Sequence, residues 1–136
     1  MIDVSKFQSI SVKDESSRTP LICITESSIT FGIGAINALG IPPFAKVVFD
    51  EENKLLYLFP CLETDLDSFS FAESNKQRYV RLKSINLHRL CNRLSGRSPA
   101  DYPYRAKGIA DSLGDGTPVI CFDMSKTYKG GEKTKN

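Results

Sequence analysis

The sequence predicts an α+β fold rich in β-strands, built from two consecutive βαββ units. Short runs of β-branched and aromatic residues, bounded by glycine, proline and aspartate, recur along the chain, which is typical of strands joined by turns. The order of elements also repeats: strand, short helix ending at a glycine, proline-containing linker, strand, turn, strand. Because one such unit has too little apolar area to be stable alone, we expect two units to pack together, within one chain or between chains.

The composition is that of an ordinary globular protein. Of the 136 residues, 40% are hydrophobic and 25% are charged, so the chain can bury a core as one compact domain or as two small ones that share a core. No apolar run approaches the roughly 20 residues that span a bilayer. The N-terminus also lacks the basic and then apolar segments of a signal peptide. We therefore expect a cytoplasmic protein that is not associated with a membrane.

An extra pair of strands is predicted at the N-terminus. Residues 7–12 alternate in part between apolar and polar, and residues 21–25 form a second apolar run. The polar stretch between them ends at Pro20 and is predicted to be an exposed loop.

The first βαββ unit follows these strands. Residues 27–31 are predicted to be extended, and residues 32–39 to form a short helix that ends at Gly40. Residues 45–49 and 55–59 are β-rich runs on either side of a polar turn, and they predict a hairpin.

The second βαββ unit repeats this order after an acidic connector in which Phe69 and Phe71 alternate as in an edge strand. Its elements are an extended segment at 79–82, a helix at 84–94 that stops at Gly96, and a hairpin with arms at 105–110 and 118–124.

The predicted organisation has four segments. They are residues 1–62 (N-terminal strands and first βαββ unit), 63–78 (acidic connector), 79–126 (second unit, with a basic helix) and 127–136 (a polar tail expected to be disordered).

The stretch from Ile29 through Leu39-Gly40-Ile41 to the hairpin that ends at Leu58 resembles the AbrB-like swapped-hairpin modules of bacterial transition-state regulators and antitoxins. The resemblance implies that two units interlock into a small barrel, and tandem copies within one chain occur in relatives of the MraZ type. It also implies a DNA-binding transcription regulator that acts as a dimer. Members of that family carry cations at the strand-to-helix junction, whereas residues 32–37 of this chain have none. We therefore expect that the first unit does not bind DNA by itself.

The remainder of the chain, including Tyr104-Arg105-Ala106-Lys107-Gly108 and Phe122-Asp123-Met124, resembles uncharacterised proteins from mobile elements of Gram-positive bacteria. This likeness implies no activity.

Charge is distributed unevenly along the chain. The formal net charge is +2, but residues 1–75 carry −6, residues 76–107 carry +8 and residues 108–136 are neutral. Such an asymmetry predicts either an anionic partner for the basic segment or pairing between the two halves.

The basic segment contains an amphipathic helix. Leu87, Leu90, Cys91 and Leu94 fall on one stripe, and the arginines fall on the other faces. Three arginines recur every four residues, so their charges repel one another unless an anion lies beside them. The candidate nucleic-acid-binding residues are Arg78, Arg81, Lys83, Asn86, Arg89, Arg93 and Arg97. The alternative is a solvated helix face, or pairing with Glu63, Asp65, Asp67 and Glu73 across a dimer.

Nothing in the sequence identifies a reaction. The four cysteines, Cys23, Cys61, Cys91 and Cys121, form no C-x-x-C pair and are expected to be reduced and buried. The only histidine, His88, has no ligand or catalytic partner at a suitable spacing, so it is expected to lie at the surface. We expect no catalytic residue, no metal site and no cofactor.

Two hypotheses for function remain. The first is a non-enzymatic, dimeric DNA-binding regulator, either an autorepressor or an antitoxin-like protein, that acts through the basic helix. The alternative is a protein-interaction or structural module of a mobile element that does not bind DNA.

Overall fold

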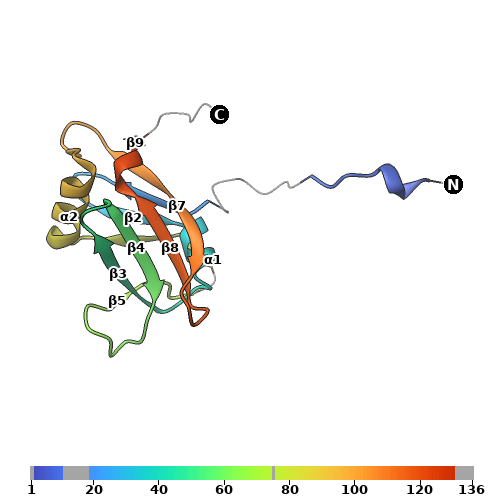
Figure 1. Cartoon of the computed structure of the whole chain (residues 1–136), viewed down its shortest axis with the longest axis horizontal. Coiled ribbons are helices and arrows are strands. Elements are labelled where there is room, and N and C mark those ends of the chain that lie inside the picture. Colours follow the sequence, from blue (N-terminus) through green and yellow to red (C-terminus); the bar gives the residue numbers. More distant parts are fainter. Residues whose placement is uncertain (1, 11–18, 75, 131–136) are drawn as a thin grey trace.

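A single antiparallel sheet, curled into a half-barrel, forms the body of the protein (Figure 1). The computed structural model describes residues 2–10, 19–74 and 76–130, and within them the sheet has nine strands in the order β5-β3-β4-β8-β7-β1-β2-β6, with β9 beside β7. The strands are β1 Leu21–Ile24, β2 Ile29–Gly32, β3 Phe44–Asp50, β4 Leu55–Pro60, β5 Phe69–Ser70, β6 Tyr79–Leu82, β7 Tyr104–Ser112, β8 Pro118–Asp123 and β9 Tyr128–Lys129. The prediction of a β-rich α+β fold is thereby confirmed.

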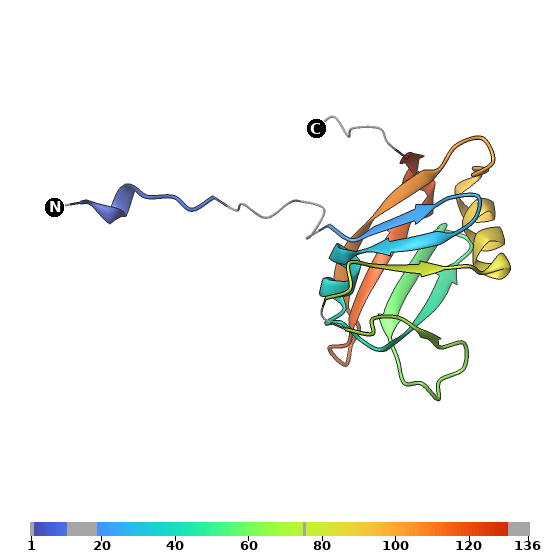
Figure 2. The same cartoon turned by 180° about the vertical axis from the view of Figure 1, so that it is seen from behind.

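Two α-helices lie at opposite ends of the half-barrel, α1 (Ile33–Ala38) and α2 (Ile85–Ser95) (Figure 2). The N-terminus of α2 is capped by Ser84, whose side chain accepts a hydrogen bond from the backbone N–H of Leu87. Gly96 ends the helix with φ +68°, a left-handed conformation that favours glycine. Within the described residues, neither helix is long and apolar enough to cross a membrane.

The strand β7 belongs to both parts of the sheet. Its first half, Tyr104–Lys107, pairs with β1, and its second half, Gly108–Ser112, pairs with β8. We call β6-β2-β1 with the first half of β7 and β9 "ladder A", and β5-β3-β4-β8 with the second half of β7 "ladder B". The change of partner along one strand is what curls the sheet.

A close approach at Gly108 makes this curl possible. A Cβ atom on Gly108 would lie 2.4 Å from Cγ2 of Ile120 and 2.7 Å from Cε1 of Phe122. Both neighbours are fully buried side chains of β8. Only a glycine therefore allows β7 to pass over these two residues.

Apolar side chains from both ladders fill the inside of the half-barrel. Phe31 of β2 lies at its centre, with ring centroids 6.0 Å from Phe71 and 5.9 Å from Phe122. The buried face of α2, with Leu90, Cys91 and Leu94, joins the same core. Alternation along the strands places the other side chains on the outer surface.

Corresponding strands of the two βαββ segments pair with each other. β2 pairs with β6, and β4 pairs with β8, both antiparallel. The two segments therefore share one sheet and one core rather than forming separate bodies.

The predicted first strand of the N-terminal pair is absent. Residues 7–10 are not in a strand, and residues 11 and 12 lie outside the described residues. The partner predicted for them, β1, is paired on one side with β2 and on the other with β7. Because both edges of β1 are occupied, it has no free edge for a further strand.

The prediction of a disordered tail was wrong for its first residues. Tyr128 and Lys129 form β9, in register with Arg105 and Tyr104 of β7. The N–H of Gly130 donates a hydrogen bond of 2.7 Å to the carbonyl oxygen of Pro103. Residues 131–136 lie outside the described residues.

Replacing Gly108 by alanine is expected to destabilise the protein by about 1–3 kcal/mol, because the added methyl group must displace Ile120 or Phe122 in a packed core. Urea unfolding measures the change in the free energy of unfolding. Gly114→Ala in the same hairpin is the control, since a Cβ at Gly114 has no atom within 4 Å. Equal stability of the two variants would contradict the close approach.

Candidate nucleic-acid interface

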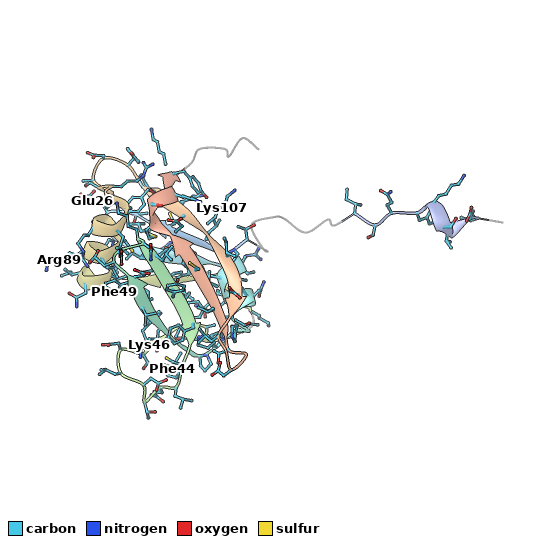
Figure 3. The ribbon with its side chains drawn as sticks, viewed as in Figure 1. Glu26, Phe44, Lys46, Phe49, Arg89 and Lys107 are labelled. Carbon is cyan, nitrogen blue, oxygen red and sulfur yellow. The ribbon has the colours of Figure 1, made fainter. Side chains whose placement is uncertain are left out.

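The structure divides the predicted nucleic-acid-binding residues among three places. Arg78, Arg81 and Lys83 lie just before, on and just after β6, and all three are exposed. Asn86, Arg89 and Arg93 are exposed along α2, and Figure 3 shows Arg89 beside this helix at the edge of the molecule. Arg97 follows α2 and is half-buried. The seven residues therefore do not form one helical patch.

Arg97 is used within the chain. Its Nε donates to Oγ1 of Thr127 over 2.6 Å, one terminal nitrogen donates to the carbonyl oxygen of Thr127 over 3.0 Å, and the other donates to the hydroxyl of Tyr102 over 2.5 Å. The guanidinium also lies 5.6 Å from the centre of the Tyr102 ring. Arg97, which the sequence analysis named as a candidate nucleic-acid contact, thus ties the loop after α2 to the segment that leads into β9.

Arg93 is paired with an acidic residue of the same chain. A terminal nitrogen of Arg93 lies 2.8 Å from Oε1 of Glu51, in the turn between β3 and β4, and each side chain is 55% exposed. The sequence analysis named Glu63, Asp65, Asp67 and Glu73 of the connector as possible partners of the arginines, but not Glu51. An exposed pair of this kind contributes about 0–1 kcal/mol, so a phosphate could replace the carboxylate but would have to displace it.

His88 attaches α2 to the sheet. Its Nδ1 lies 3.0 Å from the carbonyl oxygen of Ser84, and its Nε2 lies 3.0 Å from the carbonyl oxygen of Thr25 in the turn between β1 and β2. The side chain is half-buried rather than at the surface as predicted. Its role is to hold α2 against ladder A.

The outer face of ladder A is basic. Strand register places Arg81, Thr30, Cys23, Arg105 and Tyr128 in one row across β6, β2, β1, β7 and β9. No strand of ladder A contains an aspartate or a glutamate. The strands of ladder B, in contrast, contain three aspartates, Asp50, Asp111 and Asp123.

An exposed aromatic ring accompanies these cations. Tyr79 is 51% exposed on β6, and the guanidinium of Arg81 lies 5.1 Å from the centre of its ring. Arg105 is half-buried, and its Nε is buried without a hydrogen-bond partner in the described part of the chain. Sequence reasoning missed Arg105 because it searched for a helical stripe. The alternation of Arg105 and Lys107 with the buried Tyr104 and Ala106 is the signal that could have found it.

A groove separates the open edges of the half-barrel. It has a volume of about 570 Å³ and lies between β3 and β5 on one side and the end of β6 and α2 on the other. Apolar side chains form most of its wall, including Val47, Phe49, Phe69, Leu82 and Leu87. Only Phe44 and Ala45 of β3 pair with β5, so among the residues that the structure describes, the rest of this edge of β3 has no strand beside it along the groove.

The cysteines are free thiols, of which only Cys91 is buried. The prediction that all four are buried was therefore wrong for Cys23, Cys61 and Cys121, which are partly exposed. Burial raises the pKa of Cys91 to about 12. Within the described residues, no group of three or more His, Cys, Asp or Glu side chains could hold a metal ion.

The stability of the protein is expected to fall above about pH 9. Burial raises the pKa of Cys91 from 9.0 to about 12 and that of Tyr104 from 10.0 to about 12 in the folded state. Between about pH 9 and pH 12, the thiol and the phenol lose their protons in the unfolded chain but keep them in the folded protein, so rising pH favours unfolding. Urea midpoints at pH 7.5 and pH 10.5 measure this, and the fall should be smaller in Cys91→Ala. An identical fall in both proteins would contradict the role of the buried thiol.

Comparison of the chain with protein-family models, with curated proteins and with solved structures gave no significant match. The geometry of the protein itself therefore carries the argument for its function.

Proposed function

We propose that the protein is a non-enzymatic DNA-binding regulator that contacts the phosphate backbone with the outer face of ladder A and the adjoining start of α2. The observation that carries this proposal is the separation of charge between the two ladders. The strands of ladder A present cations without any carboxylate, whereas the strands of ladder B hold three aspartates. Clustered cations are what binding to phosphate requires, because each neutralised phosphate releases counterions.

The cations available for this contact are those without an internal partner. The ion pairs among the described residues are Arg93 with Glu51 and Lys126 with Asp123. The proposed contact residues are Arg78, Arg81, Lys83, Arg89 and Arg105, with Asn86 beside them. Arg97 is left out because three of its N–H groups form hydrogen bonds within the chain.

Tyr79 adds a second kind of contact. Its half-exposed ring, with Arg81 stacked over it, offers an apolar face next to the cations. Aromatic and guanidinium planes of this kind pack against sugars and bases.

The pairing of corresponding strands supports a tandem swapped-hairpin arrangement of the AbrB-like type. In such an arrangement two βαββ units complete each other's sheet, as β2 with β6 and β4 with β8 do here. The role as an autorepressor or antitoxin-like regulator follows from that resemblance and is part of the proposal.

A second candidate function is a protein-interaction module that does not bind DNA. The apolar groove of about 570 Å³ along the free edge of β3 favours it, because an extended peptide can add a strand at such an edge. If the protein does not bind DNA at low salt, the protein-interaction module becomes the better supported of the two functions.

The test is the salt dependence of binding to random duplex DNA, measured by fluorescence anisotropy. The wild-type protein should bind at low salt. Arg78→Gln/Arg81→Gln should weaken binding and reduce the slope of log K against log salt by about 2, because each phosphate contact contributes about 0.9. Lys46→Gln/Lys54→Gln removes two cations from β3 and from the turn between β3 and β4, on the side of ladder B, and is the matched control, for which the slope should not change.

Arg97→Ala is expected to lower the stability of the protein without changing its binding to DNA. It loses three hydrogen bonds that tie the loop after α2 to the segment before β9, so its midpoint of unfolding should fall. Under conditions in which the variant is folded, the slope of log K against log salt for DNA binding should equal that of the wild type. No DNA binding by the wild type at low salt, or an unchanged slope in the Arg78/Arg81 variant, would overturn the proposal.

A further inference from the structure

The outer face of ladder B presents an apolar row across four strands. Val48 of β3 lies opposite Tyr57 of β4, Tyr57 opposite Cys121 of β8, and Cys121 opposite Ile109 of β7. On the two central strands, the residues that alternate with this row are buried in the core: Leu56 and Leu58 of β4, and Ile120 and Phe122 of β8. The two ends of the row are open to solvent, since Ile109 is 73% exposed and Val48 is 37% exposed, and Tyr57 and Cys121 between them are half-buried.

Charged residues flank this row in an antisymmetric pattern. Two residues to one side of the row, β3 carries Lys46 and β7 carries Asp111, in register with Phe59 and Val119 of the strands between them. Two residues to the other side, β3 carries Asp50 and β7 carries Lys107, and the strands between them carry Leu55 and Asp123. Asp123 is already paired with Lys126 of the same chain. Each outer strand of the face thus holds one cation and one anion, in opposite order.

We infer that this face binds a second copy of the same chain. The two copies are related by a two-fold axis that runs parallel to the strands and passes between β4 and β8. Rotation about this axis places β3 of one copy opposite β7 of the other and β4 opposite β8, and each row of residues faces the same row of the second copy. It places Lys46 of one copy opposite Asp111 of the other, and Asp50 opposite Lys107. Each flanking pair therefore joins opposite charges, twice over by symmetry.

The apolar row gives this arrangement its driving force. The same axis packs Val48 of one copy against Ile109 of the other and brings the two central residues, Tyr57 and Cys121, together. Face-to-face packing of two sheets buries such rows. Figure 3 shows Lys46 and Lys107 toward opposite sides of this face, as the pairing requires.

The size of the face sets the strength of the dimer. Four strands about 4.8 Å apart and about five residues of each strand cover roughly 20 Å by 15 Å. This is well below the roughly 800 Å² per partner of a stable complex. We therefore expect a weak dimer that forms only at high protein concentration.

This inference does not rest on the proposed function. The proposed dimer contacts lie on ladder B, apart from Lys107 in the first half of β7, which is not among the proposed DNA contacts. Either proposal can therefore fail without the other.

Sedimentation equilibrium of the full chain, with a reducing agent and from about 10 µM to 1 mM, is the first test. The average mass of the wild type should rise toward twice the monomer mass. Ile109→Glu should remain monomeric, because it places a charge at the most exposed position of the row. Ile85→Glu on α2 is the control, since Ile85 is 70% exposed and away from this face, and it should associate like the wild type.

Exchange of the flanking charges is the second test. Lys46→Glu and Asp111→Lys should each weaken association by about tenfold, because each brings like charges together twice. The double variant should restore association to near the wild-type level, while circular dichroism checks that all variants are folded. A wild type that stays monomeric to 1 mM, an Ile109→Glu variant that still associates, or a double variant without recovery would overturn the inference.

Discussion

The architecture depends on the approach of β7 to β8 at Gly108. Because Gly108 has no side chain, Ile120 and Phe122 can fill the space beneath it while β7 leaves ladder B and continues into ladder A. This one strand therefore joins two ladders with different outer faces around a single core. The arrangement of charge along β7 follows from it, since Tyr104–Lys107 lie on the basic ladder and Gly108–Ser112 on the ladder with aspartates.

The basic segment of the sequence has two roles in the structure. Arg97 and Arg93 stabilise the fold, the first through Thr127 and Tyr102 and the second through Glu51. The cations of β6 and Arg105 have no carboxylate on their own ladder and remain available to an external anion. A count of charges along the chain does not distinguish these roles, because the distinction depends on contacts between residues that are far apart in sequence.

The local pattern of the sequence predicted most of the helices and strands, but not which strands pair with each other. The helix at 84–94 was correct to within one residue at each end because Ser84 and Gly96 are strong local signals. No strand forms at residues 7–10, the described part of the strand expected at 7–12, and both edges of β1 are already paired. The short strand at Tyr128 was missed because its pairing with Arg105 is long-range. The helical pattern pointed only to the cations of α2, whereas the cations of ladder A come from three separate strands, β6, β7 and β9.

The central claim is that one face of the sheet, and not the helix alone, binds DNA. Mapping of backbone amide chemical shifts during titration with duplex DNA tests it most directly. The account predicts that the largest changes fall on β6, β2, β1 and the first half of β7, together with the first turn of α2. Changes confined to ladder B or to the groove beside β3, or no changes at low salt, would contradict it.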